Sequence, residues 1–188
     1  MPRSVDTPFP DTFDSLLACL RRFRVRHAVI GALAVAVWGT SRATQDIDCL
    51  VMLRQGEHER LVNLLRRRGF MLDAHWAGQN PMLKGLCMRF RHGGIPVDLL
   101  LATDSHHMQA LKRRRLKRVN GKHVWVLAPE DLILMKLRAG RYRDFDDVLS
   151  IVSEQKKIDH AYLKQWAKQL GLWEEVMYCL TQSKPPAL

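Results

Sequence analysis

The sequence has no closely spaced cysteines and no long apolar run. Its four cysteines, Cys19, Cys49, Cys87 and Cys179, are far apart and form no CxxC motif. This spacing argues against a disulfide framework or a structural zinc site, so we expect reduced, buried thiols. No apolar stretch approaches the roughly 20 residues that span a bilayer, and the opening MPRSVDTPFPD lacks the apolar core of a signal peptide. We therefore expect a cytoplasmic protein with no membrane partner.

Acidic residues are scarce relative to basic ones. Lys and Arg total 30 against 19 Asp and Glu, which gives a formal net charge of +11. A charge of this sign favours an anionic partner such as nucleic acid, a nucleotide or an acidic lipid. No acid occurs between Asp104 and Glu130, and the candidate nucleic-acid-binding cations in that span are Arg113, Arg114, Arg115, Lys117, Arg118 and Lys122.

The 188 residues contain no internal repeat and no low-complexity tract, and 47% of them are hydrophobic. Segments with strand and helix periodicity alternate up to about residue 127, and the apolar spacing is helical afterwards. We predict an α+β fold: a small mixed sheet with helices on one side, followed by a C-terminal helical subdomain. The predicted boundaries are a flexible arm at 1–10, a core at 11–127, the helical subdomain at 128–182 and a disordered tail at 183–188.

The most informative stretch runs from His27 to Val51. A predicted strand ends at Gly31, a helix follows, and Asp46-Ile47-Asp48 begins a new strand. Alternation along a strand puts Asp46 and Asp48 on one face, about 7 Å apart. Two such carboxylates repel unless a cation lies between them, and Mg²⁺ prefers hard oxygen ligands of this kind. The turn at Gly31 leads into a helix N-terminus, whose free amides would point toward an anion such as a triphosphate.

A third carboxylate, Asp98, is the only charge in the apolar segment 95–101. A lone charge in a buried strand needs a partner. Taken by itself, such an aspartate most often forms a salt bridge or caps a helix. Beside Asp46 and Asp48, it becomes a candidate to share a second metal ion or to deprotonate an attacking hydroxyl.

The order of these pieces resembles the nucleotidyltransferase superfamily that shares its fold with DNA polymerase beta. That superfamily has a Gly-Gly or Gly-Ser turn, a helix, an hDhDh strand and a third Asp on a later strand. Here the matching residues are Gly31-Ala32, Asp46-Ile47-Asp48 and Asp98. The run 42–48 is similar to the RxTxDhD form of bacterial minimal nucleotidyltransferases, including the toxin-like group named for AbiEii. Segments 128–137 and 143–148 are similar to that group's lysine-bearing helix and RxxD-type helix start.

The resemblance implies a chemistry for these residues. Asp46, Asp48 and Asp98 would be catalytic and hold two Mg²⁺ ions, with Mn²⁺ as the alternative metal. A nucleoside triphosphate would donate its nucleoside monophosphate to an acceptor hydroxyl and release pyrophosphate. The residues placed at the nucleotide are Gly31, Ala32, Arg42, Thr44 and Lys136.

Three of these positions carry a qualification from the residues themselves. Ala32 stands where the family has Gly or Ser, so a hydroxyl contact to phosphate is lost and a Cβ crowds the approach. Arg42 has a plain surface position as its alternative. Lys136 lies on an apolar helix face, from which it either reaches the triphosphate or snorkels to water.

The sequence leaves the acceptor open. RNA, including a transfer RNA end, agrees with the basic surface, and the toxin-like resemblance points the same way and implies an antitoxin protein as a partner. The alternatives are a protein hydroxyl or an aminosugar antibiotic, whose positive charge a protein of net charge +11 repels at long range. A non-enzymatic alternative is a nucleic-acid-binding regulatory module with a degenerate site.

Overall fold

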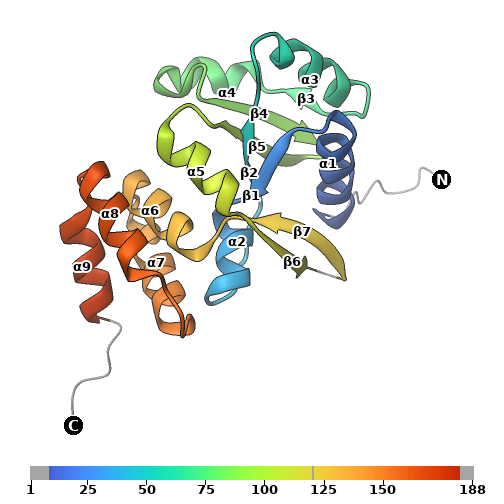
Figure 1. Cartoon of the computed structure of the whole chain (residues 1–188). Helices are drawn as coiled ribbons and strands as arrows, with labels where there is room; N and C mark the ends of the chain where they lie inside the picture. Colours follow the sequence, from blue (N-terminus) through green and yellow to red (C-terminus); the bar gives the residue numbers. More distant parts are fainter. Residues whose placement is uncertain (1–8, 120, 183–188) are drawn as a thin grey trace. The chain divides into compact units, whose positions relative to one another are not determined.

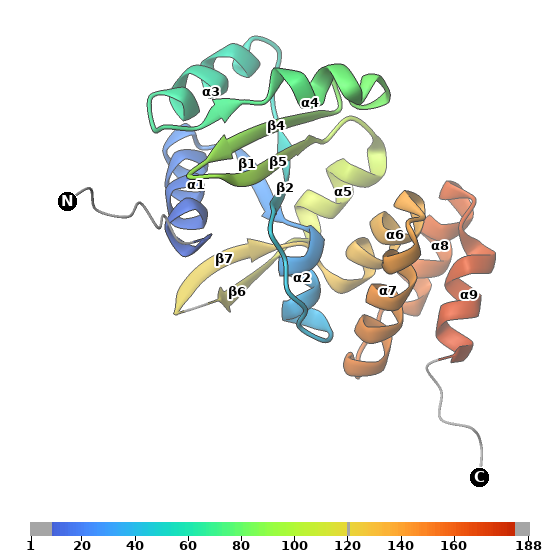
Figure 2. The same ribbon diagram turned by 180° about the vertical axis from the view of Figure 1, so that it is seen from behind.

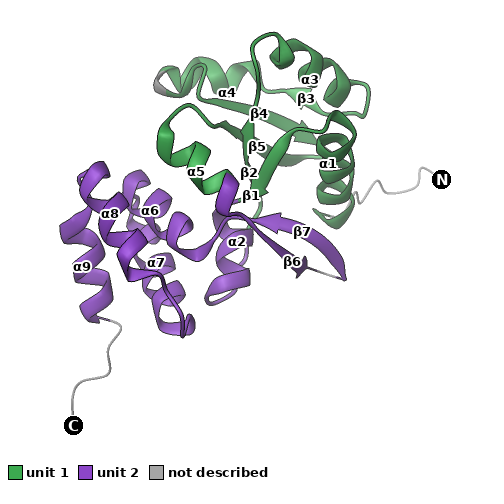
Figure 3. Ribbon diagram, in the orientation of Figure 1, with its two compact units in different colours: residues 1–29, 44–111 green, residues 30–43, 112–188 purple. Residues whose placement is uncertain are grey.

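The structure is a computed structural model of the chain, and it describes residues 9–119 and 121–182. These residues form two compact units, each built from two stretches of chain (Figure 3). Unit 1 comprises the residues up to 29 together with 44–111, and unit 2 comprises 30–43 together with those from 112 onward. The predicted tail at 183–188 and most of the predicted arm at 1–10 lie outside the described residues. The predicted boundary between a core and a helical subdomain at residue 127 stays a prediction.

The described helices are α1 (Phe9–Phe23), α2 (Gly31–Trp38), α3 (Glu57–Arg66), α4 (Ala74–Gln79), α5 (Ser105–Arg113), α6 (Pro129–Ala139), α7 (Tyr142–Glu154), α8 (His160–Leu170) and α9 (Trp173–Gln182), with a 3₁₀ turn at Pro81–Leu83. The described strands are β1 (Arg26–Val29), β2 (Ile47–Met52), β3 (Met71–Leu72), β4 (Cys87–His92), β5 (Ile95–Leu101), β6 (Arg115–Val119) and β7 (Lys122–Val126).

Unit 1 is built on a mixed sheet. Its strands follow the order β3-β4-β5-β2-β1, in which β2 and β5 are parallel and the other neighbouring pairs are antiparallel. The helices α3 and α4 lie along the β3–β4 edge (Figures 1 and 2). The mixed sheet confirms the predicted α+β class.

One face of the central strands of unit 1 is core and the other carries charge. Ile47 and Cys49 are fully buried, whereas Asp48 between them is half-buried. Val97 and Leu99 on β5 are also fully buried, with Asp98 half-buried between them. Because strand side chains alternate between faces, apolar packing on one face holds both aspartates on the other.

A tight turn joins β4 to β5. Gly93 and Gly94 have φ angles of 57° and 81°, which glycine adopts without strain, and His92 pairs with Ile95 across the turn. This two-residue turn sets the register of the whole hairpin, so that Arg89 pairs with Asp98.

Unit 2 combines the β6–β7 hairpin with α2 and the four helices α6–α9 (Figure 1). The indole Nε1 of Trp38 donates to the Leu127 carbonyl at 2.7 Å, which ties α2 to the segment before α6. Gly140 and Gly171 end α6 and α8 in the left-handed region, with φ angles of 62° and 70°.

Two elements of unit 1 have no counterpart in the sequence-based predictions. The strand β3 has two residues, and α4 has six, none of them buried. Neither is long enough to show a period, so α4 depends on its cap, in which the Asp73 carboxylate accepts from the Trp76 amide at 2.9 Å. No helix in the described part of the chain is long and apolar enough to cross a membrane.

Gly39 allows a close approach of backbone within unit 2. A Cβ at this position would meet Ser150 Oγ and would lie 2.9 Å from the amide nitrogen of Ile151. We expect Gly39→Ala to lower the free energy of unfolding by about 2 kcal/mol, because overpacking against backbone forces a shift. Chemical denaturation measures this, and Gly78→Ala, at an open position in α4, is the control. Equal stability of the two variants would contradict the expectation.

Candidate active site

The site in unit 1 is a row of charged side chains across three neighbouring strands. Asp48 on β2 pairs with Asp98 on β5, and Asp98 pairs in turn with Arg89 on β4. Residues directly opposite one another in a sheet point to the same face, so these three side chains share one surface. The sequence predicted the two aspartates, but not the arginine between them and the edge of the sheet.

Arg89 holds both oxygens of Asp98. Its Nε donates to Oδ1 at 2.7 Å and its Nη2 to Oδ2 at 2.5 Å, in the parallel fork that a guanidinium and a carboxylate favour. The hydrogen bonds to Asp98 raise the pKa of Arg89, against the opposing effect of burial. The guanidinium carbon of Arg89 also lies 4.4 Å from the centroid of the Trp76 ring of α4.

Asp46 lies just before β2 and is oriented by its own loop. The hydroxyl of Thr44 donates to Asp46 Oδ1 at 2.7 Å. A charge-assisted bond of this length fixes the carboxylate before any ligand arrives. The sequence placed Thr44 at the nucleotide, and the structure places its hydroxyl on a carboxylate of the predicted catalytic set.

The three aspartates match a divalent cation in the chemistry of their donors. All are carboxylates, the hard oxygen ligands that Mg²⁺ and Mn²⁺ take. Across residues 9–119 and 121–182, however, no three His, Cys, Asp or Glu side chains converge closely enough to hold a metal ion. In this arrangement Arg89 occupies both oxygens of Asp98, and Thr44 occupies one oxygen of Asp46. The donor set therefore fits a metal in kind, while Asp98 is bound to another cation.

The predicted phosphate-binding turn belongs to unit 2. Gly31 has a φ of 63° and begins α2, so a Cβ there would be strained. No side chain caps this helix end, and Ala32 is buried in its first turn. A triphosphate contact at Gly31 and Ala32 stays a prediction.

Lys136 is the centre of a buried ion network in unit 2. Its ammonium donates to Asp144 Oδ1 at 2.8 Å and to Asp147 Oδ2 at 2.7 Å, and only 4% of the residue is exposed. Arg42 forms a bidentate pair with Asp147 at 2.9 and 3.0 Å, and Arg141 Nε binds Asp144 at 2.8 Å. Arg42 is therefore held by an ion pair, whereas the alternative reading of the sequence made it a plain surface arginine. Whether Arg42 or Lys136 also contacts a nucleotide stays a prediction.

The pKa values of the two acids in this network are displaced downward. Burial alone would raise the pKa of Asp144 and Asp147. The hydrogen bonds from Lys136, together with those from Arg141 and Arg42, outweigh burial and lower both pKa values. Both acids are thus ionised at neutral pH, and the network contains two negative and three positive charges.

The predicted nucleic-acid-binding cations are divided between half-buried and exposed positions in unit 2. Arg113 is half-buried, and it pairs with Glu130 at 2.9 Å and Asp131 at 3.2 Å and stacks on Tyr162. Arg114 lies over the Trp125 ring, and Lys117 over the Trp38 ring. The exposed cations of the β6–β7 hairpin are Arg115, Arg118 and Lys122.

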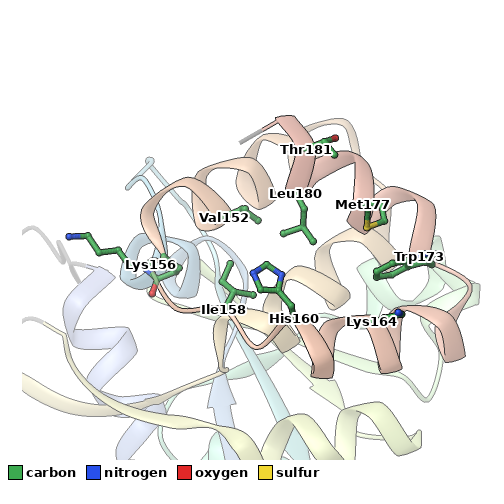
Figure 4. A pocket seen from close by; sticks show the side chains of 10 residues that line it. Val152, Lys156, Ile158, His160, Lys164, Trp173, Met177, Leu180 and Thr181 are labelled. Carbon is green, nitrogen blue, oxygen red and sulfur yellow. The ribbon is translucent and has the colours of Figure 1, made fainter. Parts of the chain in front are cut away.

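A separate cavity of about 450 Å³ lies among α7, α8 and α9. Figure 4 shows the side chains of Val152, Leu180 and His160 around this space, with Trp173 and Met177 farther along it. The lining is mainly apolar with lysines among it, and it contains no carboxylate. It therefore lacks the groups that phosphoryl transfer requires.

The cysteines offer no nucleophile. All four are free, and burial raises the pKa of the thiols of Cys19, Cys49 and Cys179. Burial and the nearby Asp98 raise the pKa of Cys87 to about 12. A thiol with so high a pKa is protonated at neutral pH and is a poor nucleophile.

The mixed sheet of unit 1 presents Asp48 and Asp98 side by side on one face. Residues 19–178 match the model of a family described as nucleotidyltransferase of unknown function (DUF6036), and the chain belongs to this family. The protein is a nucleotidyltransferase. A search of curated proteins finds no match, and membership of the toxin-like group is not confirmed by the family match.

Solved structures agree in fold. A lincosamide antibiotic adenylyltransferase, LnuA, bound to lincomycin, is similar with a TM-score of 0.56 and 13% identity, over 79% of this chain and 98% of that one. The antibiotic-resistance factor ANT(2'')-Ia is similar with a TM-score of 0.56 and 11% identity, over 90% of this chain and 92% of that one. At such identities the likeness concerns the fold alone.

Proposed function

We propose that this protein transfers a nucleoside monophosphate from a nucleoside triphosphate to an acceptor hydroxyl, with the reaction centred on Asp46, Asp48 and Asp98. The observation that carries the proposal is the register that pairs Asp48 with Asp98 on parallel strands, in a chain of a nucleotidyltransferase family. Two adjacent carboxylates on one face are costly unless the site serves a cation. That arrangement is the reason to assign the row a function beyond folding.

Divalent ions, when bound by these carboxylates, would neutralise charge on the transferred group and its leaving oxygen. The chain's own residues account for the remaining steps. Thr44 holds Asp46 in place, and the Asp98 carboxylate takes the proton of the acceptor hydroxyl. The acceptor oxygen forms a bond to the α-phosphorus, the bond from this phosphorus to the bridging oxygen of the β-phosphate breaks, and pyrophosphate leaves.

RNA is the acceptor that the charge of the molecule supports. The chain has a net charge of +11, and Arg115, Arg118 and Lys122 are exposed on the β6–β7 hairpin. Cations of this kind bind phosphate backbones without reading sequence. A toxin-like role held in check by a partner protein belongs to the same hypothesis.

An antibiotic acceptor is the second candidate. The observation that favours it is the fold likeness to the lincosamide adenylyltransferase and to ANT(2'')-Ia. The positive charge of the chain disfavours cationic aminosugars at long range, whereas a locally acidic row such as Asp46, Asp48 and Asp98 attracts them at short range.

A labelled-nucleotide transfer assay tests the proposal. The protein is incubated with Mg²⁺, each α-labelled nucleoside triphosphate in turn, and total RNA, lincomycin, tobramycin or a protein extract. We expect label on RNA with the wild-type protein and none with the double variant Asp46→Asn/Asp48→Asn. Label on an antibiotic or on protein would replace RNA with that acceptor. Absence of label on every acceptor would favour a regulatory binding module.

A further inference from the structure

The acidic row formed by Asp46, Asp48 and Asp98 is already paired with a positively charged side chain, that of Arg89. The guanidinium of Arg89 and the carboxylate of Asp98 are joined by two hydrogen bonds of 2.7 and 2.5 Å. Asp98 lies on β5, with Arg89 on the neighbouring strand β4 and Asp48 on the opposite neighbour β2. The side chains of Arg89 and Asp98 are mostly but not wholly buried, with 20% and 15% exposed. In a site that is expected to bind cations, a side-chain cation therefore already fills the position next to Asp98.

The surroundings of Arg89 offer it a second resting place. Trp76 lies against the guanidinium with its ring centroid 4.4 Å away, so the arginine is stacked as well as paired. The helix that carries Trp76 is anchored at its start, because Asp73 accepts from the Trp76 amide at 2.9 Å and from Arg91 Nε at 2.9 Å. A guanidinium that leaves Asp98 would keep its contact with the indole and stay within reach of the carboxylate.

Arg89 holds the third carboxylate of the site, which the proposed function uses to complete the cation site and to take a proton. Asp46 accepts from the Thr44 hydroxyl, which is a neutral group. The Arg89 fork therefore places a positive charge directly on the carboxylate that the proposed reaction needs.

We infer that Arg89 is a latch on Asp98: it holds the third carboxylate in the metal-free protein, and divalent-cation binding displaces it from Asp98. This inference rests on the proposed function. Arg89 is thus a positioning residue whose loss affects cation binding by the free protein. We attribute the strength of this hold on Asp98 to the bidentate geometry of the guanidinium, because a lysine would keep the charge but could not form two parallel hydrogen bonds.

Direct Mn²⁺ binding without nucleotide tests the latch. Titration of the full chain, followed by the electron paramagnetic resonance signal of free Mn²⁺, gives the dissociation constant. We expect Arg89→Gln to bind Mn²⁺ roughly tenfold more tightly than the wild-type protein, a difference of about 1.4 kcal/mol. Arg89→Lys is expected to lie between the two, because it keeps the charge and loses the bidentate geometry.

Arg91→Gln is the matched control. Arg91 lies two residues along β4 on the same face, and its partner is Asp73 rather than a member of the acidic row. It removes one positive charge close by, so it measures the general effect of charge on Mn²⁺ affinity. Equal affinities for Arg89→Gln and Arg91→Gln, or weaker binding by Arg89→Gln than by the wild-type protein, would overturn the latch.

The two proposals fail differently in this experiment. If Asp46→Asn abolishes Mn²⁺ binding while Arg89→Gln leaves the affinity unchanged, the latch is wrong and the metal site stands. If neither the wild-type protein nor Arg89→Gln binds Mn²⁺ or transfers a nucleotide, the proposed function is wrong and the latch is overturned with it. Thermal unfolding of each variant separates a lost site from a lost fold.

Discussion

Asp48→Asn is expected to lower the rate of nucleotidyl transfer by about three orders of magnitude or more, because preorganised charge is the largest single contribution to such reactions. The fold should be unaffected. Asn has nearly the same shape as Asp, and the substitution removes one of two like charges that face each other on β2 and β5. We therefore expect the unfolding temperature to stay close to that of the wild-type protein.

This combination of lost activity and retained stability separates a catalytic carboxylate from a structural one. The measurement is single-turnover transfer of label, with thermal unfolding of the same preparation. Glu59→Gln, an exposed carboxylate on α3, is the control and should leave both quantities unchanged. Wild-type transfer rates in Asp48→Asn would show that the acidic row is not the reaction centre.

Much of unit 1 could be predicted because its strands have an apolar face. The alternation around Asp48 and around Asp98 sets the two carboxylates on the opposite face, and the Gly93-Gly94 turn sets the β4–β5 hairpin. The same turn also predicts that Arg89 lies opposite Asp98. A two-residue loop that pairs 92 with 95 must also pair 89 with 98. Counting the register across that turn would have identified the partner that a lone buried charge requires.

What the sequence did not predict depends on contacts between distant segments. Arg42 and Asp147 are 105 positions apart, so no local pattern shows that the arginine of the loop binds the acid on α7. The same holds for Trp76, whose helix α4 has six residues and no buried face. A short capped helix lacks the periodicity from which helices are recognised.

Lys136→Met is expected to destabilise the protein by about 3 kcal/mol, because removing one partner of a buried ion pair leaves uncompensated charge behind. Asp144 and Asp147 are 1% and 4% exposed, so water does not replace the ammonium. Arg141 and Arg42 still hold the outer oxygens of the two acids, which keeps the cost at the lower end of the range for broken buried pairs. At this chain length, the change corresponds to a fall of roughly 10 °C in the unfolding temperature.

The matched control is Lys168→Met, which removes an exposed lysine of α8 and should cost less than about 0.5 kcal/mol. The pair of variants also distinguishes the two roles of Lys136. If Lys136 is structural, its substitution lowers the unfolding temperature. The rate of nucleotidyl transfer, measured well below that temperature, then falls only to the extent that the Arg42 loop is disturbed. A lysine that contacts the triphosphate as a point charge would instead raise KM strongly, with little loss of stability. Because both acids pair with Lys136 at less than 3 Å, we expect the first result.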